Sequence, residues 1–336
     1  MPQLSVLLPY HNAEGTLGEC LESVRAQCLE DFELLAVNDR STDASRDLVQ
    51  RWSRRDTRVR DLACEGKGLV AALNTGLRRA RAPIIVRMDA DDRMLPGRLD
   101  AHLNHFRSTP GLDLSAVQVR MFPDSAVRAG YRAYLEWQNR VLTPSDVADE
   151  IFVEAPFAHP AVAFRRETVL RLGGYRDGDF PEDYELWLRL FGHGARMEKI
   201  PEVLLEWRES DGRLSRRDPR YGRDAFDRLR AHHLARLLRD RAAGRGLAIW
   251  GAGRRTRRRA DHLIGHGFAP DLWIDIDPRK IGNHVQGAPV CGPEALATWP
   301  RPFVLVYVAN HGARDLIASQ LQVSGYQRGI DYLAVG

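Results

Sequence analysis

Three carboxylates follow an apolar stretch near residue 90, and they are the residues of this sequence best suited to chemistry. The run Ile84–Met88 has the composition of a buried strand, and Asp89, Asp91 and Asp92 come directly after it. Carboxylates so close together repel one another, and folded proteins tolerate them where a cation neutralises their charge. The cluster therefore indicates a Mg²⁺ or Mn²⁺ site facing a phosphorylated ligand. The alternative interpretation is an acidic surface turn.

Strand patterns and helix patterns alternate in the part of the chain that carries these carboxylates. Strands are expected over residues 4–8, 32–37, 59–63 and 83–88, and helices over 14–28, 42–52 and 68–82. In the first helix Leu17, Leu21, Val24 and Cys28 recur at helical spacing, which predicts an apolar face against a sheet. This alternation is typical of a parallel, doubly wound α/β sheet that binds its ligand at the carboxyl ends of the strands.

A polar loop follows each of these strands, and parallel strands place such loops at one edge of the sheet. The loops before the acidic cluster are Pro9–Glu14, Asn38–Asp43 and Glu65–Gly68. Each loop alone can be explained as a turn, a helix cap or a solvated side chain. Together, at one sheet edge, they predict a binding site.

Residues 4–92 resemble the nucleotide-binding half of the family 2 glycosyltransferases, which have the GT-A fold. The resemblance rests on the motifs PYHNAE, VNDRSTD, GLVAALNTGL and IIVRMDADD, which occur in the order of the family. It implies that Pro9, Glu14 and Asp39 line a pocket for uracil and ribose, with Asp39 accepting a hydrogen bond from the base. Tyr10 and Asn12 belong to the same nucleotide-binding set.

The resemblance also assigns the phosphate side of the donor. Lys67, near a helix N-terminus, and Arg87 are expected to help hold the diphosphate. Asp89 and Ala90 are expected near the ribose, and Asp91 is expected to hold the metal that bridges the phosphates. Asp92 either orients these groups or caps the next helix.

A second acidic pair, Glu182-Asp183, begins a predicted helix. The helix dipole alone favours acidic residues in a first turn, but the preceding segments AHPAVAFRR and GGY resemble the acceptor half of the same family. The resemblance implies that Asp183 is the base that takes the proton of the acceptor hydroxyl and that Glu182 shapes the acceptor site. His159 and Trp187 are expected to contact substrate, and a structural role is the alternative for His159.

These assignments imply a single displacement at the anomeric carbon with inversion of configuration. A general base contributes roughly 10²- to 10⁴-fold to such a reaction, and a metal stabilises negative charge on the leaving phosphate. Asp183 must stay free to accept a proton, whereas Asp91 is committed to the cation. We therefore expect the two acidic motifs to face one another across the donor sugar.

One segment departs from the pattern of the family. Many relatives have Tyr-Arg-x-His after the acidic helix, with the His near the diphosphate or metal, whereas this sequence has Trp207-Arg208-Glu209-Ser210. Ser210 thus stands in the place of the His. Either Glu209 or His193 substitutes for it, or this loop closes differently.

A basic helix is predicted over residues 219–243, with arginines around an apolar side formed by Phe226, Leu229, Leu234, Leu237 and Leu238. We favour packing of this helix between two domains. The alternative is a helix that lies on an anionic membrane carrying a lipid-linked acceptor. On this basis we expect a GT-A type domain over residues 1–215, a connecting helix over 216–244 and a smaller domain over 245–336.

The last segment begins with a predicted strand, the turn Gly251–Gly253, a helix and a second strand over 272–277. This pattern resembles the opening of a Rossmann-like α/β domain, with Asp275 near the ~20-residue spacing of a ribose-binding acid. Thr256 occupies the third glycine position of that motif. The segment also resembles the small domain that precedes some bacterial sugar acyltransferases. We expect a scaffold or homo-oligomerisation module, ahead of a sugar-nucleotide sensor and of an NAD enzyme.

Composition limits the classes of protein. The 336 residues are 44% hydrophobic with a net charge of +4, which suits globular domains and gives no sign of a nucleic-acid partner. No apolar run approaches the ~18 residues of a membrane helix, and the N-terminus lacks a signal-type stretch, so we expect a cytoplasmic protein that contacts a membrane only at its inner face. The cysteines lack the CxxC spacing of a zinc site.

The favoured hypothesis is an inverting glycosyltransferase of polysaccharide biosynthesis that uses a UDP-sugar and a glycan or lipid-linked acceptor. A nucleotidyltransferase is the first alternative, but it would need a Gly-rich basic loop where this sequence has Tyr10-His11-Asn12. A non-catalytic nucleotide-sugar-binding regulator is the second, and it would have no use for Asp183. Selectivity for sugar and acceptor is expected in residues 112–158, where no motif is recognised.

Overall fold

The computed structural model describes residues 1–123, 127, 129–210, 212–308 and 312–336. The chain forms two compact units, each built from segments that are not all contiguous. The first unit comprises Met1–Val147, Pro156–Gly178 and Glu182–Arg217, and the second comprises Ala148–Ala155, Asp179–Pro181 and Asp218–Gly336. The predicted connecting helix lies in the second unit.

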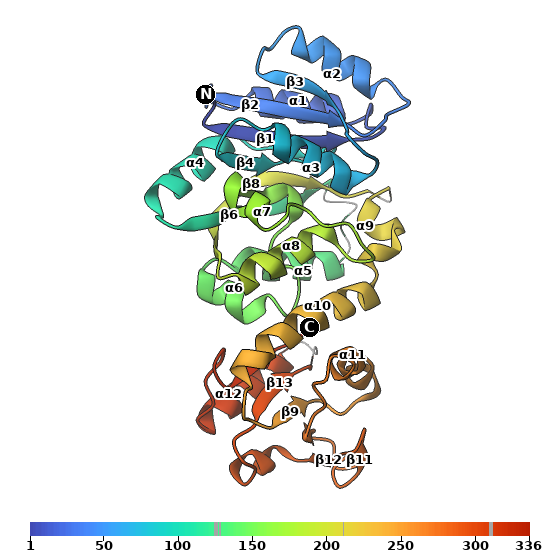
Figure 1. The fold of residues 1–336 in the computed structure, drawn as a ribbon, viewed down its shortest axis with the longest axis vertical. Helices are drawn as coiled ribbons and strands as arrows, with labels where there is room; N and C mark the ends of the chain where they lie inside the picture. The colour runs from blue at the N-terminus through green and yellow to red at the C-terminus, as the bar shows by residue number, and fades with distance from the viewer. Residues whose placement is uncertain (124–126, 128, 211, 309–311) are drawn as a thin grey trace. The chain divides into compact units, whose positions relative to one another are not determined.

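The first unit begins with the predicted alternation of strands and helices (Figure 1). The strands are β1 (Leu4–Tyr10), β2 (Phe32–Asn38), β3 (Val59–Ala63) and β4 (Ile84–Arg87), and the helices are α1 (Leu17–Arg25), α2 (Ser45–Ser53) and α3 (Leu69–Arg79). Strand β1 pairs in parallel with both β2 and β4, and β2 pairs in parallel with β3. All four strands therefore end at one edge of the sheet.

The rest of the first unit adds strands of both directions to this sheet. They are β5 (Arg93–Met94), β6 (Leu112–Phe122), β7 (Val162–Arg165) and β8 (Arg196–Arg208). The eight strands take the order β3-β2-β1-β4-β7-β6-β8-β5. Because β7 is antiparallel to both β4 and β6, the sheet is mixed. Four parallel strands, β1 to β4, form its β3 end, and β6 and β8 pair in parallel toward the other end. The remaining helices are α4 (Arg98–Ser108), α5 (Ala129–Arg140), α6 (Pro144–Glu150), α7 (Arg166–Arg171), α8 (Glu182–Gly192) and α9 (Leu214–Arg217).

Helices cover both faces of the parallel part of this sheet. On one face Leu17, Leu21 and Val24 of α1 are buried in the core together with alternate residues of β1, each side chain contributing about 1.5–3 kcal/mol by leaving water. On the other face α3 approaches β1 so closely that a Cβ added at Gly76 would lie 2.1 Å from Leu7 Cδ1. This double covering agrees with the predicted α/β class.

The first helix is shorter than the sequence predicted. It begins at Leu17 because Ala13–Thr16 form a turn in which the backbone N–H groups of Thr16 and Leu17 both donate to the carbonyl of Ala13. It ends at Arg25, so that Cys28 is exposed beyond its end. The expectation that Cys28 extends the apolar face is therefore wrong.

The second unit contains a smaller, mostly parallel sheet of six strands in the order β11-β12-β10-β9-β13-β14. The strands are β9 (Leu247–Trp250), β10 (Leu272–Ile274), β11 (His284–Val285), β12 (Ala288–Cys291), β13 (Phe303–Val306) and β14 (Tyr332–Ala334). Only β11 runs antiparallel to its neighbour among the paired strands described. The first strand, β9, lies in the interior of the sheet with connections to both sides, as in a doubly wound fold.

Helices α10 (Arg223–Arg241), α11 (Arg254–Ile264) and α12 (Ala313–Val323) complete the second unit. Helix α10 packs against α11, and Leu229, Leu234 and Leu238 of α10 are buried. Phe226 and Leu237, the other apolar residues predicted for this helix, are only partly buried. Across the described ranges, the structure contains no helix with the length and apolar character that crossing a bilayer requires.

Candidate active site

The loop after β2 and the loop before α3 meet at Asp39. Both carboxylate oxygens of Asp39 accept the backbone N–H of Gly68, at 3.0 and 2.9 Å. Gly68 has a φ of +92°, a conformation that L side chains rarely adopt. This hydrogen bond holds the half-buried Asp39 carboxylate at the carboxyl edge of the sheet. The expected proximity of these two loops is therefore observed.

The loops after β1 and β2 interlock through polar side chains. Asn12 Oδ1 accepts the N–H of Thr42 at 2.8 Å, and Glu14 Oε2 accepts the N–H of Ala44 at 2.9 Å. In return, Asp43 Oδ2 accepts the N–H of Glu14 at 3.0 Å. Asn12 and Glu14, both expected in the nucleotide site, are exposed at the correct edge, and each shapes the neighbouring loop.

The other predicted nucleotide-binding residues differ in their exposure. Pro9 is buried, and Tyr10 is 3% exposed with its hydroxyl 3.5 Å from Asp61 Oδ1. Burial, with Asp61 beside the hydroxyl, raises the pKa of Tyr10. Lys67 is exposed on the loop before α3, whereas Ala90 is 9% exposed. Of these four residues, Lys67 offers a charged group to solvent.

The acidic cluster after β4 has the composition of a divalent cation site. Ligand oxygens of Asp89, Asp91 and Asp92 all lie within 4.8 Å of one another. Asp92 is 1% exposed; its Oδ1 accepts the N–H of Arg208 at 2.7 Å, while its buried Oδ2 has no hydrogen-bond partner among the residues that the structure describes. A buried carboxylate oxygen without a donor, beside two further carboxylates, fits Mg²⁺ or Mn²⁺, because these ions prefer oxygen ligands.

Crowding of the carboxylates also changes their titration. Burial, followed by the charge of Asp89, raises the pKa of Asp91 to about 6, and Arg213 and Arg208 offset part of that rise. Burial and the neighbouring Asp91 raise the pKa of Asp92 well above its usual range. A cation bound among these side chains would favour their ionised forms.

The end of β8 and the segment after it bring two arginines to this cluster. Arg208 Nε donates to the carbonyl oxygen of Asp91 at 2.6 Å. Arg213 stacks over the ring of Trp207, 4.1 Å from its centroid, and pairs with Glu209 Oε2 at 3.2 Å. Arg213 lies outside the motif, and no feature of its sequence context pointed to it.

Neither proposed substitute for the missing His joins the acidic cluster. The Glu209 carboxylate is engaged by Arg213 and Arg216. His193 follows the last residue of α8, where its Nδ1 lies 2.8 Å from the carbonyl of Arg189; at 1.5 Å per residue this is about 15 Å along the helix from Asp183. Of the alternatives, a loop that closes differently agrees best with this geometry.

The second acidic pair begins α8. Glu182 is 2% exposed, whereas Asp183 is partly exposed and its Oδ1 accepts the N–H of Tyr184 at 2.7 Å. Burial and the adjacent Glu182 raise the pKa of Asp183 to about 8, and that hydrogen bond and Arg87 act in the opposite direction. A carboxylate with so high a pKa is suited to accept a proton near neutral pH.

Arg87 and His159 connect the two acidic motifs. The guanidinium of Arg87 donates to Asp89 Oδ1 at 2.6 Å and to His159 Nε2 at 3.3 Å. On the other side of the imidazole ring, His159 Nδ1 lies 3.6 Å from Glu182 Oε1. The structure thus brings Asp89 and Glu182 to the two ends of one buried group of side chains.

Two of the predicted site residues lie deeper than a substrate contact requires. Arg87, expected at the diphosphate, is 1% exposed, and its guanidinium is turned toward protein groups. Trp187, expected to contact substrate, is 0% exposed and packs at a ring-centroid distance of 6.0 Å from His159. Tyr175, for which the sequence indicated no role, places its hydroxyl 3.0 Å from His159 Nε2.

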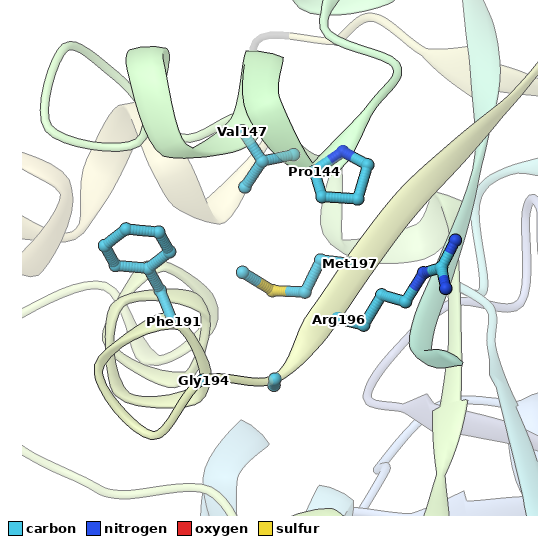
Figure 2. Close-up of a pocket in the computed structure, with 7 residues that line it drawn as sticks. Pro144, Val147, Phe191, Gly194, Arg196 and Met197 are labelled. Carbon is cyan, nitrogen blue, oxygen red and sulfur yellow. The ribbon is translucent and has the colours of Figure 1, made fainter. Parts of the chain in front are cut away.

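A cavity lies elsewhere in the first unit. It has a volume of about 410 Å³ and is lined by Pro144, Val147, Phe191, Gly194, Ala195, Arg196 and Met197 (Figure 2). Phe191 lies near the C-terminal end of α8, about 12 Å along the helix from the acidic pair at its N-terminal end. This mostly apolar cavity is therefore separate from the carboxylate sites.

The sequence of this chain is similar to those of known proteins from one family. The sequence model of glycosyl transferase family 2 matches residues 5–173. The amylovoran biosynthesis glycosyltransferase AmsE of Erwinia amylovora is 31% identical over 63% of this chain and 79% of its own length. An Escherichia coli UDP-Gal:α-D-GlcNAc-diphosphoundecaprenol β-1,3-galactosyltransferase is 28% identical over 64% of this chain and 78% of its own length.

Solved structures support the same fold. TarS of S. aureus in complex with UDP-GlcNAc superposes with a TM-score of 0.55 at 14% identity, covering 79% of each chain. The mannosyltransferase PcManGT of Pyrobaculum calidifontis, in complex with GDP-Man and Mn²⁺, superposes with a TM-score of 0.52 at 20% identity, covering 97% of this chain and 81% of its own. With the family match over half of the sequence, these findings show that the chain belongs to glycosyl transferase family 2 and is a glycosyltransferase with a GT-A fold.

Proposed function

We propose that this protein is an inverting glycosyltransferase that moves a sugar from a nucleoside diphosphate donor to a hydroxyl group of a glycan. The observation that carries the proposal is the connection of the acidic cluster to the acidic pair through Arg87 and His159. A protein that only binds a nucleotide would need the cluster but not the partly exposed, high-pKa Asp183 beside it.

The donor site is proposed at the carboxyl edge of β1, β2 and β4. Asp39 is held there by Gly68, and its remaining lone pairs are available to accept the ring N–H of uracil. UDP is the favoured nucleotide, because TarS is named with UDP-GlcNAc and the E. coli relative with UDP-Gal. Asp89 is proposed near the ribose, and exposed Lys67 is proposed near the phosphates.

The acidic cluster is proposed to hold a divalent cation, with Asp91 as its principal ligand. A bound Mn²⁺ or Mg²⁺ would stabilise negative charge on the departing diphosphate. Of the chain's own groups, Arg208 and Arg213 add positive charge at the same place. They take over part of the task that the His of the related motif would perform.

Asp183 is proposed as the general base. In its ionised form it accepts the proton of the acceptor hydroxyl while that oxygen forms a bond to the anomeric carbon of the donor. The bond from the anomeric carbon to the diphosphate oxygen breaks on the opposite face, so that configuration inverts and the electron pair leaves with the diphosphate. Glu182 is proposed to shape the acceptor site beside the base.

The acceptor is proposed to be a sugar hydroxyl of a surface polysaccharide or of its lipid-linked precursor. This proposal rests on the names of relatives, which concern amylovoran, O-antigen and a diphosphoundecaprenol-linked sugar. Contact with the inner face of a membrane would have to rely mainly on exposed arginines of α10, because Leu229, Leu234 and Leu238 are buried. For the second unit we retain the proposal of a scaffold or homo-oligomerisation module.

Incubation with a panel of UDP- and GDP-sugars and Mn²⁺ tests the proposed function. We expect release of the nucleoside diphosphate from one donor, and loss of this release by at least ~10²-fold in Asp183→Asn with unchanged UDP affinity. Formation of UTP from UDP-sugar and pyrophosphate would instead indicate a nucleotidyltransferase. UDP-sugar binding without turnover, with any acceptor glycan tried, would indicate a regulator.

A further inference from the structure

The link between the two acidic motifs is closed on every side by protein. Arg87 is 1% exposed, His159 7% and Glu182 2%. Arg87 connects Asp89 to His159, because its three guanidinium nitrogens contact three groups, namely Asp89, His159 and the carbonyl of Met88. A buried guanidinium needs a carboxylate close by, and Asp89, at the start of the acidic cluster, supplies it.

The protonation of His159 follows from its neighbours. Burial, and secondarily the charge of Arg87, lower the pKa of His159 well below its usual range, so the imidazole is neutral. An arginine Nε–H can only donate, and it points at His159 Nε2 from 3.3 Å. Nε2 must therefore be the acceptor, which places the single ring proton on Nδ1. That proton faces Glu182 Oε1, 3.6 Å away.

We propose that Arg87 and His159 are positioning residues that connect the donor site to the base: Arg87 orients Asp89 directly and orients Glu182 through the Nδ1–H tautomer of His159. This inference rests on the proposed function. It assigns Arg87 a task other than holding the diphosphate, and it assigns His159 a task other than touching substrate. Tyr175, whose hydroxyl lies 3.0 Å from His159 Nε2, fixes the plane of the ring.

Substitutions at Arg87 and at His159 are predicted to affect different parts of the site. Arg87 contacts Asp89 and so acts on both the donor side and the base side. His159 contacts Glu182 but not Asp89, so that its loss acts on the base side alone. A purely structural Arg–His pair would produce neither pattern, and would only lower stability.

The same unit contains such a structural pair as a control. Arg98 and His102 are each 0% exposed, and Arg98 Nε donates to His102 Nε2 at 3.4 Å. The other ring nitrogen of His102 faces Ser115 Oγ at 2.9 Å rather than a carboxylate. Arg98 also donates to the backbone carbonyls of Arg87 and Pro160, so the control is His102→Gln alone. It matches His159→Gln because both histidines are buried and both accept from an arginine Nε–H.

Two substitutions of His159 distinguish the contribution of Nδ1 from that of Nε2. In His159→Asn the side-chain amide can take the place of Nδ1–H and donate to Glu182, whereas in His159→Gln the amide oxygen can take the place of Nε2 and accept from Arg87. The charged groups that face the base are Glu182, Arg87 and the Tyr175 hydroxyl, and all of them remain in both variants. The variants therefore differ in the polar group that they present to Glu182 Oε1.

The experiment measures UDP affinity by calorimetry and the pH profile of nucleotide release in these variants, after Asp183→Asn has shown that release requires the base. We expect His159→Gln to lower kcat by at least ~10-fold and to move the acidic limb of the profile, with UDP affinity unchanged. His159→Asn is expected to retain more activity, and Arg87→Lys is expected to weaken UDP binding as well. Equal losses in His159→Gln and His102→Gln, with the limb unmoved, would overturn the proposal.

A second measurement does not depend on activity. Nitrogen NMR of ¹⁵N-histidine-labelled protein is expected to show His159 as the neutral Nδ1–H tautomer at pH 6 to 8. The signals of His159 are assigned by their loss in His159→Gln. A protonated ring or an Nε2–H tautomer would overturn the proposal even if the protein is an active glycosyltransferase. If the tautomer is observed but no donor is turned over, the proposed function fails and the arrangement of the side chains stands.

Discussion

Asn74 and Tyr175 lie 101 residues apart in the sequence and are joined by two hydrogen bonds of 2.9 Å. The Asn74 side-chain amide donates to the carbonyl of Tyr175, and its oxygen accepts the N–H of the same residue. Gly174 permits this approach, because a Cβ at that position would lie 2.5 Å from Asn74 Oδ1. Helix α3 of the donor half thereby positions the tyrosine whose hydroxyl contacts His159.

Replacement of Asn74 by Ala is expected to lower both stability and turnover. The substitution leaves a backbone N–H and a carbonyl at Tyr175 without their partner, which costs about 1–3 kcal/mol. Urea unfolding should show this loss. Arg78 lies on the same helix as Asn74 and forms an exposed ion pair with Glu65. Arg78→Ala should therefore lower the free energy of unfolding by no more than about 1 kcal/mol. Equal effects of both substitutions would contradict the prediction.

Asp183→Asn is expected to stabilise the protein in a pH-dependent way. The pKa of Asp183 is about 8 in the folded protein and about 3.9 in an unfolded chain. The wild-type side chain therefore favours folding below pH 4 and loses this contribution as the pH rises through about 8. The variant cannot ionise, so its gain in melting temperature over wild type should be small at pH 5 and larger at pH 8, as calorimetry can test. A gain independent of pH would refute the assigned pKa.

Activity is expected to have an acidic limb set by the same group. The base works only when ionised, so kcat/KM for the acceptor should rise with pH up to about 8 and then level off. The observed midpoint describes the coupled pair Glu182 and Asp183 rather than one carboxylate. Profiles of nucleotide release in the wild type and in Glu182→Gln check this, because removal of the neighbouring charge should move the limb to lower pH.

Chelation is expected to abolish nucleotide release without unfolding the protein. Mn²⁺ added back to chelated protein should raise its melting temperature, because a ligand that binds only the folded state stabilises it. Asp91→Asn should lose most of this rise. Asp47→Asn, which changes an exposed residue in the first turn of α2, should retain it. A Mn²⁺ effect that persists in Asp91→Asn would place the cation elsewhere.

Gly76→Ala is expected to destabilise the first unit. The added methyl group would lie 2.1 Å from Leu7 Cδ1 and 3.2 Å from Val37 Cγ2, and overpacking of this kind typically costs about 1–3 kcal/mol. Gly130, also helical, has no atom within 4 Å of an added Cβ. Gly130→Ala should therefore be neutral or stabilising, because Ala favours helix by up to ~1 kcal/mol. Denaturant midpoints distinguish the two.

The alternation of β1 to β4 with α1 to α3 could be predicted from sequence because each strand and helix has an apolar period of its own. The contact between the loops of Asp39 and Gly68 also followed, since parallel strands end at one edge. The direction of β7 could not be predicted, because a short apolar run such as Val162–Arg165 has the same pattern in a parallel strand as in an antiparallel one.

Burial of charged residues was the main feature that sequence reasoning missed. Arg87 adjoins three aspartates, and an arginine in that context suggests a solvent-facing contact with phosphate. Its interior position depends on His159, which is 72 residues away in the chain. Arg213 was missed for a similar reason, because its contacts with Trp207 and Glu209 arise only when the segment after β8 folds back on itself.

Strand β4 pairs in parallel with β1 on one side and antiparallel with β7 on the other. The register of β4 against β1 aligns Leu4 with Ile84, and the N–H of Met88, just after β4, donates to the carbonyl of Leu7. Main-chain pairing therefore holds the chain up to the residue that precedes Asp89. Substitutions of the surrounding side chains can thus change the charge of the acidic cluster without moving the point of the backbone from which it projects.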